Sequence, residues 1–246
     1  MHTDVNDLDA FYASPLGKVV RLLIGRILRE RWENCAGLSV VGYGYCAPYL
    51  ERFRDEARCA LALMPAQQGV VAWPSTSRCA SALVMGEMLP LPDASVERVL
   101  VAHGLETAEH PSDLLEEICR VLAPEGRALI IVPSRRGVWA RVDGTPFGQG
   151  QPFSKSQLRD LVRDTVFSPI YWGEALYMPP LTSRFLMKSA APLERVGAAL
   201  GLPFAGVHVL EAVKQIYRPI SVRRVQRQPV VALRPTLAPN ARREGA

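Results

Sequence analysis

The sequence has few cysteines, no long hydrophobic run and no leader, and each absence excludes a class of protein. Its five cysteines are widely spaced and form no Cys-x-x-Cys pair, so neither a disulfide framework nor a zinc ribbon is indicated. The longest apolar run is the eight residues from Cys59 to Ala66, against the roughly 18–20 that cross a bilayer. No segment has the composition of a secretory signal peptide. We therefore predict reduced thiols, no membrane span and a cytoplasmic location.

An excess of one charge is also missing from most of the chain. The formal net charge is +5 at pH 7, but residues 221–246 hold six arginines and one glutamate, which accounts for all of it. This stretch is rich in Arg, Gln and Pro and has no apolar periodicity, so we predict a basic, disordered tail at 221–246. Residues 1–220 are neutral on balance and show no basic face. The charge therefore does not favour a nucleic-acid partner.

What the sequence does have is a hydrophobic content of 48%, enough for a well-covered core, and we predict a single domain over residues 1–220. Its first part, residues 1–33, contains an amphipathic basic helix. Ser14 is an N-cap followed by Pro15, and apolar residues recur at helical spacing up to Ile27. Two interpretations of this helix are open: packing on the sheet or over a ligand site, and attachment to a membrane surface.

Short apolar strands alternate with helices in the first half of the chain. We predict strands at 38–41, 58–64, 80–85, 96–102 and 126–132, and helices after Pro48 and over 111–122. Pro65, Gly69 and Pro74 predict a loop over 65–79 in place of a crossover helix. This alternation is typical of an α/β protein whose parallel sheet is covered by helices on both faces.

The second half of the chain is less regular. Residues 134–150 are polar and rich in turn-forming residues, and Ser154 and Gln157 form a capping box that starts a helix to about residue 166. Strands are predicted at 167–175 and 206–216, with a largely helical segment at 182–200 between them. We interpret 134–200 as partly an insertion on the substrate side of the domain.

Candidate functional residues lie where strands end. Gly42 and Gly44 follow the first strand, at a turn where a ligand could approach the main chain and meet no Cβ. His103 ends the fourth strand, at the edge where open α/β sheets hold ligands. It is a candidate general base, and the alternative is a histidine that only lines a cleft.

A metal site is not predicted. His103, Glu106 and His110 would need to lie on one helical face to share a metal ion, and Gly104 and Pro111 break the helix that would bring them together.

A longer pattern covers residues 86–103 and 114–133. It consists of Gly-Glu-Met-Leu-Pro-Leu-Pro-Asp ahead of a strand, and then a helix, Pro-Glu-Gly and a second strand. This combination resembles the second half of class I S-adenosylmethionine-dependent methyltransferases, in the methyltransferase type 11-like branch whose substrates are mostly small molecules. The resemblance implies a Rossmann-like sheet of seven mostly parallel strands with a late antiparallel pair, and S-adenosylmethionine as the cofactor.

The resemblance also implies the cofactor contacts. It places the turn of Gly42, Tyr43 and Gly44 against the cofactor. The resemblance also places the Glu87 carboxylate at the adenine amino group of the cofactor, with the Met88 backbone nearby. It places His103 along the cofactor cleft. Where the family binds both ribose hydroxyls with an acid, residues 63–68 have none. Gln67 or Gln68 is the candidate neutral substitute, and two solvated loop glutamines are the alternative.

The first-half motifs are degenerate in other ways. Val40 stands where the family has an acid, and Tyr43 and Tyr45 add bulk to a loop that is normally slim. Two functions are therefore open: a methyltransferase with an unidentified small-molecule acceptor, and a non-catalytic protein of the same fold that serves as a partner or regulatory subunit. Attachment to nucleic acid or to a membrane surface, through the arginine-rich tail and the first helix, is a third.

Overall fold

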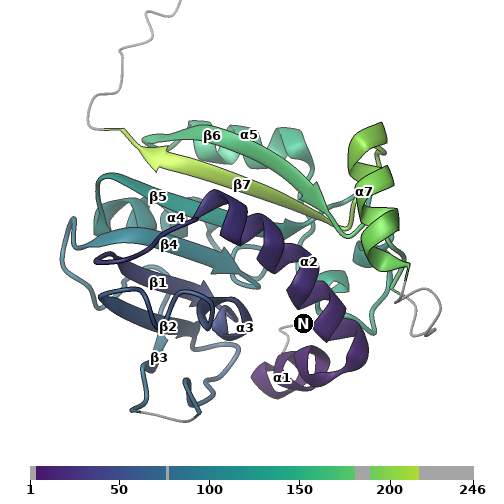
Figure 1. The fold of residues 1–246 in the computed structure, drawn as a ribbon. Helices are drawn as coiled ribbons and strands as arrows, with labels where there is room; N and C mark the ends of the chain where they lie inside the picture. The colour runs from purple at the N-terminus through teal and green to yellow at the C-terminus, as the bar shows by residue number, and fades with distance from the viewer. Residues whose placement is uncertain (1–3, 76–77, 181–188, 216–246) are drawn as a thin grey trace, which may run out of the picture.

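The computed structural model describes residues 4–75, 78–180 and 189–215, so the predicted tail at 221–246 lies outside the described residues. These residues form a seven-stranded sheet in the order β3-β2-β1-β4-β5-β7-β6 (Figure 1). The strands are β1 Ser39–Gly44, β2 Cys59–Pro65, β3 Ser81–Val84, β4 Val96–Ala102, β5 Leu122–Pro133, β6 Phe167–Ala175 and β7 Val207–Lys214. Strands β1 to β5 pair in parallel, and β7 runs antiparallel to both β5 and β6. The predicted α/β fold is thus confirmed.

Helices cover both faces of the sheet. The α-helices are α1 Val5–Ala13, α2 Pro15–Arg31, α3 Ala47–Leu50, α4 Pro111–Val121, α5 Lys155–Arg163 and α7 Ala190–Leu200, with 3₁₀ turns η1 Trp139–Arg141 and η2 Pro146–Gly148. One hydrophobic core joins α1, α2 and α3 to one face, and the other joins α4 and α5 to the opposite face. Of the predicted helical segment at 182–200, residues 182–188 lie outside the described residues and α7 accounts for the rest.

The amino-terminal region folds as two helices, of which the sequence pattern indicated the second. Asp4 caps α1 by accepting a hydrogen bond from the Asn6 amide, and Ser14 caps α2 by accepting one from the Gly17 amide. Helix α2 buries its apolar side, including Leu23 and Ile24, in the core. Helix α2 therefore packs on the rest of the protein, which was the first of the two interpretations of this amphipathic helix. In Figure 1, α1 lies beyond the arrowheads of β1 and β4.

Two buried contacts fix the far end of α2 on the sheet. The carboxylate of Glu211 in β7 is fully buried and accepts hydrogen bonds from Arg31 Nε at 2.7 Å and Trp32 Nε1 at 3.1 Å. A charged group of this kind is stable in the interior because it is paired and hydrogen-bonded. The amino-terminal helices are therefore anchored at both ends of α2.

The segment between β2 and β3 is a loop, as Pro65, Gly69 and Pro74 predicted. Its described residues, 66–75 and 78–80, contain no helix. The helix predicted after Pro48 is shorter than expected, because α3 ends at Leu50 and the chain continues in turns to Glu56. No helix of the described residues is long and apolar enough to cross a membrane. The five cysteines are free thiols.

Candidate functional site at the carboxyl edge of β1 and β4

The glycine turn lies at the carboxyl end of β1, and the chain itself fills the space around it. Gly44 has φ +86°, and a Cβ placed there would lie 2.2 Å from the carbonyl oxygen of Ala102 in β4. A Cβ on Gly42, which lies inside β1, would be 2.5 Å from Cys46 Cβ. The two glycines thus let β1 approach β4 and α3 closely.

Tyr43 points to the other face of the sheet. Its side chain is 3% exposed, and a Cβ added to Gly86 would lie 2.3 Å from its hydroxyl oxygen. Burial, and after it the negative charge of Glu87, raises the pKa of Tyr43 to about 12. Tyr43 is therefore a neutral, packed side chain close to the loop that carries Glu87.

His103 lies at the end of β4 in a buried polar network. It has φ +52°, its Nε2 is 2.8 Å from the Tyr12 hydroxyl, and its Nδ1 is 3.4 Å from Glu106 Oε1. The Glu106 carboxylate favours the proton on Nδ1, so we assign Nε2 as the acceptor of the Tyr12 hydroxyl. The hydroxyls of Tyr12 and Tyr49 are 2.9 Å apart. Burial raises the pKa of both tyrosines, so both donate as neutral hydroxyls.

Glu106 is the incomplete member of this network. Its side chain is buried, and its Oε2 has no hydrogen-bond partner among the described residues. An unsatisfied buried carboxylate oxygen is costly, and in native proteins it often marks a place where a water or a ligand donates. The sequence pattern had considered Glu106 only for metal binding, and the described residues hold no group of three His, Cys, Asp or Glu side chains that could bind a metal.

The loop after β2 crosses the edge next to His103. Gln68 is 3% exposed, and its side-chain amide donates to the His103 carbonyl oxygen. Its backbone carbonyl oxygen accepts from the Val5 amide at 2.8 Å. Gln67 is exposed and donates to Glu109 at 3.3 Å. The Phe147 ring closes the other side, with its centroid 4.9 Å from the His103 ring. Loop, α1 and η2 together cover the edge.

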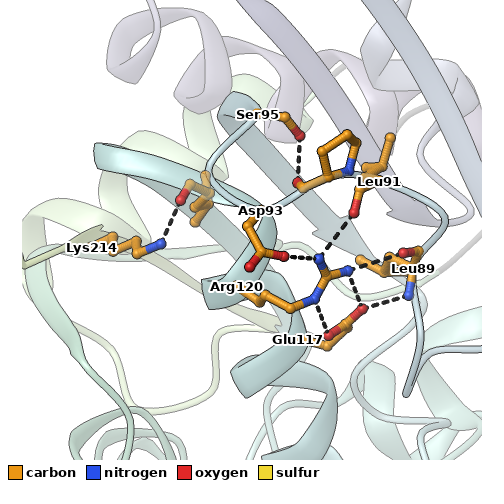
Figure 2. Close-up of polar contacts among 9 residues, drawn as sticks. Leu89, Leu91, Asp93, Ser95, Glu117, Arg120 and Lys214 are labelled. Atoms are coloured by element: carbon orange, nitrogen blue, oxygen red, sulfur yellow. Dashed lines mark hydrogen bonds and ion pairs between the residues drawn. The ribbon is translucent and has the colours of Figure 1, made fainter.

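Glu87 and Met88 lie apart from this buried set, on an exposed loop that is fixed just downstream. Figure 2 shows Arg120 of α4 reaching into the loop 89–93. It donates to the carbonyl oxygens of Leu89 and Leu91 at 3.1 and 3.0 Å, and it also pairs with Asp93. Glu117 accepts from the Leu89 amide at 2.7 Å, and its pKa is lowered, chiefly by the Arg120 hydrogen bond. The loop that presents Glu87 is therefore held to α4.

The seven predicted residues fall into two groups in the structure. Gly42, Gly44 and His103 meet at the buried ends of β1 and β4, with Tyr43 packed behind them. The three others, Gln67, Glu87 and Met88, are exposed. Gln68 and Tyr12 are bonded to His103 at this edge, and the glycines at 42 and 44 carry no Cβ that would keep a cofactor away from the main chain. The cofactor role of each of these residues remains a prediction.

A cavity lies beside the closed edge. It has a volume of about 780 Å³ and is lined by α1, α2, the start of α3 and residues 71–73. None of the seven predicted residues lines it, but Tyr12, which binds His103, does. Tyr12, Phe147 and this cavity were missed by sequence reasoning, since they join the edge from segments that are distant along the chain.

Comparisons with known proteins agree with the fold. Residues 25–130 match the family model of a methyltransferase domain. A curated relative, the ubiquinone/menaquinone biosynthesis C-methyltransferase of Chromobacterium violaceum, is 33% identical over 99 residues, which are 40% of this chain and 39% of that protein. The chain thus spans about two fifths of that relative's length.

Solved structures match over most of the chain at low identity. An S-adenosylmethionine-dependent methyltransferase from Thermotoga maritima superposes with a TM-score of 0.58 and 14% identity, over 86% of this chain and 96% of that one. A putative methyltransferase from Haloferax volcanii, solved in complex with the Trm112 methyltransferase activator, superposes with a TM-score of 0.59 and 19% identity. The match covers 87% of this chain and 98% of that one. Likeness at these identities shows a shared fold.

Proposed function

We propose that this chain is a class I S-adenosylmethionine-dependent methyltransferase and that it transfers the methyl group of S-adenosylmethionine to a small-molecule acceptor. The observation that supports this function is the match of residues 25–130 to the methyltransferase domain. That segment contains β1 to β4 and most of β5, and so it contains the sheet edge at which Gly44 and His103 meet. The bound cofactor would supply an electrophilic methyl group, and the protein would supply positioning.

His103 is the proposed general base. Glu106 lies 3.4 Å from Nδ1 and orients the imidazole ring, and Nε2 is the atom left to accept a proton. Because Tyr12 occupies Nε2 and also lines the cavity, a proton from an acceptor in the cavity would reach His103 through the Tyr12 hydroxyl. The His103 side chain is buried.

A second candidate is a non-catalytic methyltransferase-fold protein that acts as a partner or regulatory subunit. The closed edge favours it, because Gln68 is bonded to the His103 carbonyl and β4 lies against Gly44. The absence of an acid at Val40 and in residues 63–68 points the same way, since each lost polar anchor is worth about 1–3 kcal/mol when buried.

Calorimetric titration with S-adenosylmethionine and with its demethylated product separates the two candidates. We expect both compounds to bind the full chain if the protein is a methyltransferase. Binding of neither compound would reject the enzyme and leave the partner protein. Binding of both, without transfer to any of a panel of small phenols, amines and carboxylates, would reject a small-molecule acceptor.

Glu87 gives the residue-level test of the cofactor site. Replacing Glu87 with Ala should weaken S-adenosylmethionine binding about tenfold, the loss expected when a charged hydrogen-bond acceptor is removed. The matched control is Glu116→Ala, which removes an exposed glutamate from α4. Equal affinities in wild type and Glu87→Ala would remove Glu87 from the site.

A further inference from the structure

The cavity beside the closed edge has the size of a ligand site. Its volume of about 780 Å³ lies within the range of roughly 300–1,000 Å³ that small-molecule pockets occupy. Its walls come from the corner between α1 and α2, from the residues after Gly44 and from the segment that follows β2. No predicted cofactor residue is part of it, so its ligand is a separate question from cofactor binding.

Three cations face this cavity, and none of them is paired. They are Lys18 and Arg21, one turn apart on α2, and Arg52, just after α3. All three are exposed, and no carboxylate of the described residues lies within ion-pair distance of them. Unpaired cations around a concave surface create a positive potential that attracts anions.

The two carboxylates of the cavity wall already have hydrogen-bond donors. Asp9 Oδ1 accepts from the Tyr45 hydroxyl at 2.8 Å. Glu51 accepts from Trp73 Nε1 at 3.2 Å and pairs with Arg54, also at 3.2 Å. These bonds orient the aromatic side chains of the wall and leave the three cations free to bind a ligand.

The Arg52 side chain packs against α2 at Gly25, where a larger residue would leave no room for it. A Cβ on Gly25 would lie 2.6 Å from Arg52 Nε and 2.7 Å from its Cζ, so the guanidinium group rests against the helix backbone at this glycine. A glycine inside a helix is destabilising relative to alanine. The chain accepts that cost at Gly25 and places the Arg52 guanidinium group at the cavity.

Flat aromatic surfaces form the inner wall. The rings of Tyr12 and Tyr45 stack with centroids 5.6 Å apart and an angle of 25° between their planes, and the Trp73 indole is fixed by its bond to Glu51. Tyr12 also carries the hydroxyl that binds His103. A ligand against this wall is one side chain away from the histidine at the end of β4.

We propose that this cavity binds a small organic anion, with its carboxylate or phosphate group at Lys18, Arg21 and Arg52 and a planar group against the aromatic wall. The arginines match such groups because their N–H donors lie in a plane and carry full charge. This proposal deepens the proposed function, because it gives the chemical class of the acceptor that the cavity would hold. Binding of the anion itself can be measured without methyl transfer, since none of the predicted cofactor contacts lines the cavity.

Isothermal titration with phenyl phosphate, benzoate, inorganic phosphate and phenol tests this site. We expect phenyl phosphate or benzoate to bind the full-length protein, and binding to weaken as salt is raised. Replacing Arg52 with Gln should raise the dissociation constant about tenfold, as expected for the loss of a charged hydrogen bond. Lys18→Gln, which leaves the packing at Gly25 intact, should weaken binding in the same direction.

The matched control is Arg26→Gln, which removes one exposed arginine from α2 outside the cavity. It should leave the affinity unchanged. Absence of binding by both aromatic anions, equal binding of neutral phenol, or equal losses in Arg26→Gln and Arg52→Gln would each overturn the proposal. If inorganic phosphate binds as tightly as phenyl phosphate, the assignment of the planar group to the aromatic wall is wrong.

Discussion

The Tyr12 hydroxyl lies 2.8 Å from Nε2 of His103, and this contact joins the first helix to the end of a central strand across 91 positions of sequence. The same hydroxyl is 2.9 Å from that of Tyr49. Tyr12 therefore closes a chain of buried polar groups that runs from α3 through α1 to the sheet edge. Its position explains how α1 covers His103 without leaving the histidine unsatisfied.

Replacing Tyr12 with Phe should lower the free energy of unfolding by about 1–3 kcal/mol, because it leaves buried groups on His103 and Tyr49 without a partner. Urea denaturation measures this change. Tyr171→Phe is the control, since the Tyr171 hydroxyl makes no hydrogen bond within the described part of the chain. A similar loss in both variants would mean that the network contributes no stability.

The turn at Gly44 should tolerate no side chain. Gly44→Ala places a Cβ 2.2 Å from the Ala102 carbonyl oxygen at φ +86°, so we expect a loss of about 1–2 kcal/mol from the backbone conformation and about 1–3 kcal/mol more from the overlap. Gly37→Ala separates these causes, because Gly37 has φ +76° and nothing within 4 Å of its Cβ position. Equal thermal denaturation midpoints in the two variants would contradict the close approach of β1 to β4.

The buried carboxylate of Glu211 should be a major contributor to the attachment of α2. In Glu211→Gln, the guanidinium groups of Arg31 and Arg127 lose their counter-charge, and we expect a loss of about 2 kcal/mol or more in chemical denaturation. The loss should stay below that of a wholly buried pair, because both arginines keep contact with water. The exposed Asp160 pairs with Arg163, and Asp160→Asn should cost roughly 0–1 kcal/mol.

Stability should fall in mild acid because of His208. Burial lowers the pKa of this histidine, against the opposing effect of Glu174. Below a pH of about 6.5 the unfolded chain binds a proton at this site more readily than the folded protein, so the free energy of unfolding decreases as pH falls through that value. His208→Gln should show a shallower decrease than wild type in urea unfolding between about pH 7.5 and 5.5. The exposed His110, replaced by Gln, is the matched control for the loss of one histidine.

Local sequence was sufficient for the strands of this fold and for most of its helices, α1 being the exception. The strand ends at 96–102 and 167–175 match β4 and β6, and the capping box at Ser154 and Gln157 forms as predicted, with both of its hydrogen bonds present. These features depend on neighbours within a few positions, on the alternation of apolar residues and on the shape of proline and glycine. The family resemblance supplied the strand order and the antiparallel β7, which composition alone did not give.

Only part of the candidate site could be predicted from the sequence, because the residues that form it depend on which side chains meet across the sheet edge. Gly44 and His103 were recognisable because each ends a strand. That Gln68 turns inward to His103 while Gln67 faces solvent could not be read from two adjacent glutamines in a loop. The sequence by itself determined the strands, most of the helices and the ends of the strands at which chemistry would occur, since these follow from short-range periodicity. Only the tertiary structure decided that Tyr12 and the loop after β2 cover this edge and that Lys18, Arg21 and Arg52 face one cavity, because such contacts depend on how distant segments pack.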